Sequence, residues 1–75
     1  MTTEELLKAN LDKFFEFTFS DGETTVGKLL RVNERNNEFV YEMSSTNEPT
    51  RYHNRLGKYA ASISDLQSAQ LLDKD

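Results

Sequence analysis

The sequence FEFTFSDG, residues 15–22, determines how the rest of this chain is interpreted. Phenylalanine occupies positions 15, 17 and 19, so three rings lie on one face of an extended strand. Asp21 and Gly22 tolerate the positive φ that tight turns need. The stretch therefore predicts one strand and a reversal. We interpret the rings as core rather than as a surface that stacks bases or grips a peptide.

Four more extended segments follow this turn. The return strand is predicted at residues 24–32, and Gly27 inside it permits a sharp bend. Three further strands are predicted at residues 39–43, 59–63 and 67–72. Closing five short strands into a barrel would bury their apolar positions and remove most free edges. The expected core positions are Phe15, Phe17, Phe19, Leu30 and Phe39.

An amphipathic helix precedes the strands. Thr2 and Glu5 have the spacing of a capping box, and Leu7 and Leu11 follow four residues apart on one face. We predict a helix at about 3–13 that plugs one end of the barrel. The fold class is mainly β with one N-terminal α-helix, as a small, strongly bent, five-stranded antiparallel barrel. Residues 1–75 form one domain, with the barrel at about 15–72 and a charged tail, 73–75, that is expected to fray.

Composition narrows the function classes. The chain has 75 residues, no cysteine and one histidine, His53, so disulfides and thiolate zinc sites are excluded. No nucleophile–base pattern surrounds His53, and we predict no catalytic site, metal or cofactor. No apolar run is long enough to span a membrane, and the absence of cysteine fits a cytoplasmic protein. Because small domains often need partner subunits to supplement a small core, a homo-oligomer is expected.

Charge is unevenly distributed along the chain, whose formal net charge is −4. Residues 1–24 hold six acidic residues against Lys8 and Lys13, whereas residues 49–64 hold Arg51, Arg55 and Lys58 with no acid. An acidic protein can still bind phosphates through one local basic patch.

The order of these elements resembles the Sm-like (Lsm) family, whose fold is an SH3-like, strongly bent five-stranded barrel. Asp21-Gly22 matches the family's turn, and Gly27-Lys28-Leu29 matches its Gly-x-hydrophobic step. Asn33 and Asn37 fall six and ten positions after that glycine, where the family has polar residues. Glu38 departs from the apolar residue usual after the second position, and Arg55-Leu56-Gly57 is one residue out of register with the family's basic–Gly motif.

The resemblance implies a ring whose pore loop, at Asn33 and Asn37, contacts a base of single-stranded RNA. Amide side chains donate and accept hydrogen bonds at once, which suits a base edge. The alternative is turn chemistry, because asparagine accepts left-handed backbone. The basic segment around Arg55 has three interpretations: stacking on nucleic acid, a solvated loop, or a contact with an acidic partner surface. The predicted RNA-binding residues are Asn33, Arg35, Asn37, Arg55 and Lys58.

Subunits of the expected oligomer would pair through the edges of the fourth and fifth strands. The predicted edge residues are Tyr59, Ala61, Ile63, Ala69 and Leu71. The leading hypothesis is thus a non-enzymatic Sm-like barrel, oligomeric and binding single-stranded RNA. The alternative is a protein-interaction or structural module of the same fold with no nucleic-acid role.

Overall fold

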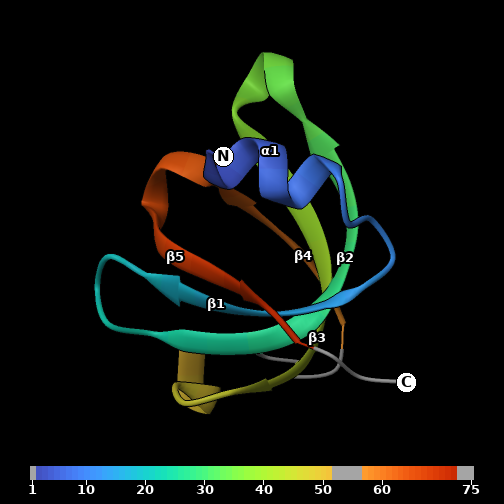
Figure 1. Ribbon diagram of the computed structural model, residues 1–75. Coiled ribbons are helices and arrows are strands. Elements are labelled where there is room, and N and C mark those ends of the chain that lie inside the picture. The colour runs from blue at the N-terminus through green and yellow to red at the C-terminus, as the bar shows by residue number, and fades with distance from the viewer. Residues whose placement is uncertain (1, 52–56, 73–75) are drawn as a thin grey trace.

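The computed structural model describes residues 2–51 and 57–72, and in them it shows one short helix and a five-stranded antiparallel sheet (Figure 1). The mainly β fold class with an N-terminal helix is confirmed. The elements are α1 Thr3–Lys8, β1 Phe14–Phe19, β2 Thr24–Asn33, η1 Glu34–Asn36, β3 Glu38–Thr46, η2 Pro49–Arg51, β4 Lys58–Ser62, η3 Ile63–Asp65 and β5 Leu66–Leu71, where η denotes a 3₁₀ turn.

The aromatic stripe of β1 forms the centre of the core. Phe15, Phe17 and Phe19 are buried while the residues between them are half-buried, as strict alternation requires. The Phe17 ring lies with its centroid 4.9 Å from that of Phe39 and 5.2 Å from that of Tyr41. Rings at these separations attract one another beyond their area burial, so β1 and β3 are held together mainly by aromatic packing.

The prediction that Leu30 lies in the core is wrong. Leu29 is fully buried and Leu30 is half-buried. The β2–β3 register shifts between Leu29 and Arg31, which inserts one unpaired residue and reverses the facing of the strand. Val32 therefore returns to the core side opposite Phe39, although it is three residues after Leu29.

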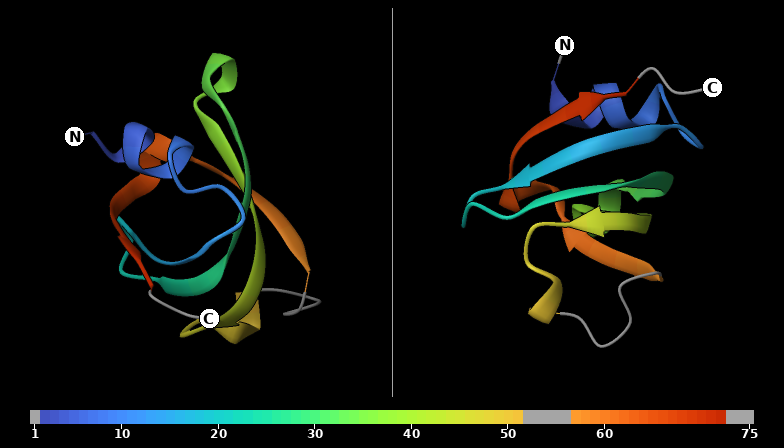
Figure 2. Two further views of the ribbon diagram at one scale, coloured as in Figure 1. Left: turned by 45° about the vertical axis from the view of Figure 1, so that its right-hand side comes forward. Right: turned by 90° about the horizontal axis from the view of Figure 1, so that it is seen from below.

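The strands form a strongly curled sheet (Figure 2), but it is not closed into a barrel as expected. The strand order is β4-β3-β2-β1-β5, so β4 and β5 end the sheet. They are consecutive in the chain and joined only by η3, yet each pairs with a different inner strand, β4 with β3 and β5 with β1. The edges that closure was expected to remove therefore stay open within the described residues.

The helix is shorter than predicted. It ends at Lys8, and the Asn10 side chain donates to the Leu6 carbonyl at 2.9 Å, which satisfies a carbonyl at the helix end. Asp12 then adopts φ 65°, and its backbone N–H donates to the Leu29 carbonyl at 2.7 Å. Leu7 is fully buried and anchors α1 over one end of the curled sheet (Figure 1), whereas Leu11 is 45% exposed.

The third strand is longer than predicted: it continues past Met43 to Thr46. Thr46 pairs with Thr25, and both hydroxyls donate to the Glu23 carboxylate, at 2.8 and 3.1 Å. Glu23 is only 5% exposed, so these donors compensate part of the cost of burying its charge. Within the described residues, no helix has the length and apolar character needed to cross a bilayer.

Candidate interaction site

The tip of the β2–β3 hairpin brings together three of the predicted RNA-binding residues. Asn33 ends β2, Arg35 lies in η1, and Asn37 follows η1; all three are exposed. Asn37 adopts left-handed backbone, φ 54°, and its N–H donates to the Glu34 carbonyl at 3.2 Å. Asparagine is favoured there because it tolerates this conformation. Turn chemistry therefore accounts for Asn37, while Asn33 and Arg35 present exposed polar groups beside it.

The hairpin tip is fastened to η3, the turn between β4 and β5. The Ile63 N–H donates to the Asn37 carbonyl at 2.8 Å, and the Asn37 side-chain amide donates to the Ser62 hydroxyl at 3.3 Å. The Ser62 and Ser64 hydroxyls lie 2.8 Å apart. Two loops distant in sequence thus form one polar surface. Sequence reasoning missed both serines, because serine in a turn carries no distinctive spacing.

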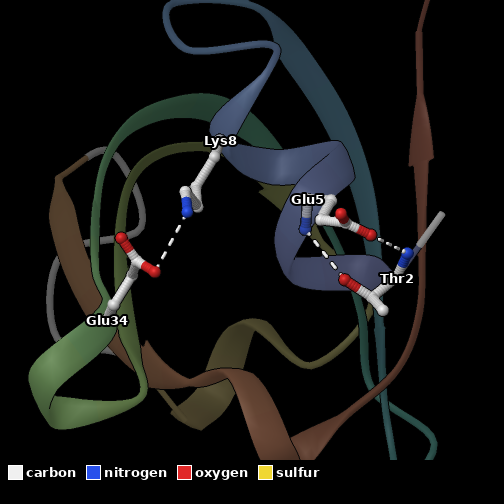
Figure 3. Close-up of polar contacts among 4 residues, drawn as sticks. All are labelled: Thr2, Glu5, Lys8 and Glu34. Carbon is white, nitrogen blue, oxygen red and sulfur yellow. Dashed lines mark hydrogen bonds and ion pairs between the residues drawn. The ribbon is translucent and has the colours of Figure 1, made fainter.

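An ion pair connects this tip to α1 (Figure 3). The Lys8 ammonium lies 3.0 Å from the Glu34 carboxylate, and both side chains are largely exposed. The hydrogen bond between them lowers the pKa of Glu34 below its ordinary 4.5 and raises that of Lys8 above its ordinary 10.5. The pair therefore stabilises the fold at pH values between the ordinary pKa of Glu34, 4.5, and the ordinary pKa of Lys8, 10.5. Its contribution is lost as pH falls through the lowered pKa of Glu34 or rises through the raised pKa of Lys8.

The start of α1 follows the predicted capping box. The Thr2 N–H donates to Glu5 Oε1 at 2.8 Å, and the Glu5 N–H donates to Thr2 Oγ1 at 3.1 Å (Figure 3). The backbone hydrogen bond from Thr2 is the main cause of a lowered pKa at Glu5. This reciprocal bonding fixes the first turn of α1.

A hollow of about 600 Å³ lies beside the tip and is acidic. It is lined by Phe19, Ser20, Asp21, Glu23, Asn36, Glu38, Tyr41, Ala60, Ala61, Ser62 and Asp65. These lining residues include four carboxylates and no lysine or arginine, so the hollow would repel phosphate. No group of three or more metal-ligating side chains that could hold a metal ion occurs in residues 2–51 and 57–72.

Lys58, another of the predicted RNA-binding residues, is not brought to the tip. Lys58 begins β4 opposite Glu42, whereas Ser62, next to the tip, ends β4 opposite Glu38. Ser62 is four residue steps along the strand from Lys58, which is about 13 Å at ~3.3 Å per step. Arg55, like the rest of residues 52–56, lies outside the described part of the chain.

The predicted edge residues fall into two groups. Tyr59 and Ala61 lie on β4, and Ala69 and Leu71 lie on β5, the two terminal strands of the sheet. Ile63 does not belong with them: it lies in η3 and is 9% exposed within the core. The period-two pattern that placed it on a strand breaks at Ser62, where the chain turns from one edge of the sheet toward the other.

No protein-family model and no curated protein matches this sequence. The roles of the tip and of the two edges therefore rest on their geometry and chemistry.

Proposed function

We propose that this chain is a non-enzymatic interaction module with an Sm-like fold, which self-associates through β4 and β5. One observation carries the proposal: apart from Lys58 at the start of β4, both terminal strands lack the charges and proline that protect the sheet edges of many monomers. The pairing of β5 with β1 is irregular only near the start of β5, where the register shifts between Thr18 and Phe19. Leu66–Leu71 contains no charged residue, proline or glycine, and Lys58–Ser62 carries its one charge at the first position. Both strands therefore offer open backbone groups to another strand.

The order of elements supports the Sm-like assignment. A helix precedes five antiparallel strands, the register between the second and third strands shifts at Gly27, and a short turn joins the last two. In this arrangement the two free edges belong to different strands, β4 and β5. Pairing one with the other joins copies head to tail, which gives a closed ring or an open chain. A reducing, cytoplasmic setting, which the absence of cysteine favours, belongs to the same proposal.

Self-association is testable by size-exclusion chromatography with light scattering. We expect a mass that is a multiple of one chain at about 100 µM, a concentration well above micromolar dissociation constants. A strictly monomeric protein at that concentration would contradict the proposal. The mass also gives the subunit number.

Single-stranded RNA is the second candidate ligand, supported by the exposed Asn33, Arg35 and Asn37 at one tip. The neighbouring Glu34, Glu38 and Asp65 limit phosphate attraction, so we expect weak, salt-sensitive binding of short uridine- or adenine-rich strands. Arg35→Gln should weaken binding measured by fluorescence anisotropy at low salt. Lys58→Gln removes a cation away from the tip and should leave binding unchanged.

Three other outcomes have distinct meanings. If Lys58→Gln weakens binding and Arg35→Gln does not, RNA binds along the basic segment rather than at the tip. If the unmodified protein does not bind RNA at low salt, the RNA role is wrong. A protein that co-purifies with the chain in the absence of RNA would then support the alternative, a protein-interaction module.

A further inference from the structure

The hollow of about 600 Å³ beside the hairpin tip has no role in the proposed function. Its walls come from the β1–β2 turn, β3, β4 and η3. Backbone hydrogen bonds join these walls: the Ser20 N–H donates to the Asp65 carbonyl at 2.9 Å, and the Ile63 N–H donates to the Asn37 carbonyl at 2.8 Å. These bonds fix the shape of the hollow, and its volume is within the range of about 300–1,000 Å³ typical of pre-formed ligand pockets.

The hollow combines apolar walls with negative charge. Its apolar lining residues are Phe19, Tyr41, Ala60 and Ala61, and its charged lining residues are Asp21, Glu23, Glu38 and Asp65. In the part of the chain that the structure describes, the Glu38 and Asp65 side chains form no hydrogen bond or ion pair. Glu38 is also half-buried. A half-buried carboxylate is stabilised by a cationic partner that replaces the water it has lost.

The distribution of the carboxylates selects the kind of cation. Within residues 2–51 and 57–72, no three of them are placed to hold one metal ion. A cation with several donors and an apolar stem matches such walls better than a point charge does. The arginine side chain has this character, because its planar guanidinium group carries five N–H donors and pairs with a carboxylate through two parallel hydrogen bonds. Its methylene groups pack against apolar surface.

We propose that the hollow binds an arginine side chain of a partner protein, whose guanidinium group pairs with Glu38 and Asp65. The stem of that side chain packs against Ala61. Charge complementarity identifies this occupant, since the hollow repels phosphate and a neutral side chain would leave both carboxylates without a partner. The inference goes beyond the proposed function, because it requires neither self-association nor RNA.

Three labelled peptides test the chemistry of the occupant by fluorescence anisotropy. We expect a peptide of alternating arginine and glycine to bind, and to bind more weakly as salt rises. The same peptide with citrulline in place of arginine has nearly the same shape and no charge, and it should not bind. A peptide with lysine in place of arginine should bind more weakly, because an ammonium group cannot form the two parallel hydrogen bonds.

Neutral variants of the two carboxylates test the place of binding. Glu38→Gln and Asp65→Asn should each weaken binding of the arginine peptide by about 10-fold or more, as loss of a charge-assisted hydrogen bond does. Glu42→Gln is the matched control: it removes the same charge from the same strand, at an exposed position outside the hollow. It should bind the peptide like the wild type. Circular dichroism checks that the variants are folded.

Several results would overturn the inference. Equal weakening by Glu42→Gln and Glu38→Gln would mean that the peptide responds only to net charge. Wild-type binding by folded Glu38→Gln and Asp65→Asn would place the peptide elsewhere. Spermidine that binds more tightly than the peptide would assign the hollow to a free polyamine. The mass of the wild-type protein without peptide tests the proposed self-association separately, so the two can fail independently.

Discussion

Phe17→Ala is expected to cost about 3–5 kcal/mol of unfolding free energy, the range found when a buried phenylalanine is truncated. Phe17 is fully buried, and its ring packs against those of Phe15, Phe39 and Tyr41. A domain of this size has a total stability of only about 4–11 kcal/mol at 0.05–0.15 kcal/mol per residue. The variant should therefore lose a large share of the stability of the domain and unfold at a much lower urea concentration. Urea denaturation at a fixed protein concentration measures the difference.

Phe14→Ala is the matched control for this prediction. Phe14 lies in the same strand on the opposite face and is half-buried. Its truncation should cost well under half as much, because little of its surface leaves a packed environment. Equal losses for the two variants would mean that the β1 rings do not form the core as described.

Gly27→Ala should cost about 3 kcal/mol, at the upper end of what overpacking usually does. A Cβ at this position would stand 2.6 Å from the Glu42 carbonyl oxygen and 3.1 Å from Cδ2 of Tyr41. The first neighbour is backbone in β3, so relief requires the two strands to separate at a point where their register already shifts, between Val26 and Gly27. Thermal and urea unfolding both report the loss.

Gly22→Ala is the control that distinguishes the steric contact at Gly27 from the conformational cost of replacing a glycine. A Cβ at Gly22 would meet no atom within 4 Å, so its cost comes only from the positive φ of 97°. That strain is worth about 1–2 kcal/mol. If Gly27→Ala is no more destabilising than Gly22→Ala, the close contact between β2 and β3 is not as described.

The sequence predicts the core well where alternation is uninterrupted. The stripe Phe15, Phe17 and Phe19 needed no information beyond its period of two, and its burial is confirmed. The same reasoning failed after Gly27, where it placed Leu30 rather than Leu29 in the core. A bulge reverses the facing of a strand without changing its composition, and pattern reasoning does not detect it.

The end of the helix was mispredicted for a related reason. Leu11 continues the apolar spacing of α1, but the backbone around it forms hydrogen bonds with β2 instead: Asp12 donates to the Leu29 carbonyl, and Leu29 donates to that of Lys13. These hydrogen bonds with β2 override the apolar spacing from Leu7 to Leu11, because a short helix has little stability of its own. The capping box at Thr2 and Glu5 is entirely local, and it was correctly predicted.

The candidate site was predictable only in its local part. Asn33, Arg35 and Asn37 are close in sequence and lie together at one tip. Ser62 reaches Asn37 from 25 residues away, and the Thr46 hydroxyl reaches Glu23 from 23 away. Such pairs depend on strand register, which no spacing in a single sequence reveals. The two terminal strands were predicted from the order of elements and from their apolar composition, whereas the open sheet differs from the predicted closed barrel.

The most direct test of the central claim is an isotope-filtered NOE experiment on a mixture of labelled and unlabelled chains, which detects contacts between copies only. We expect intermolecular NOEs between side chains of β4 of one copy and side chains of β5 of another. Intermolecular NOEs that connect other surfaces, with none between these two strands, would contradict the account.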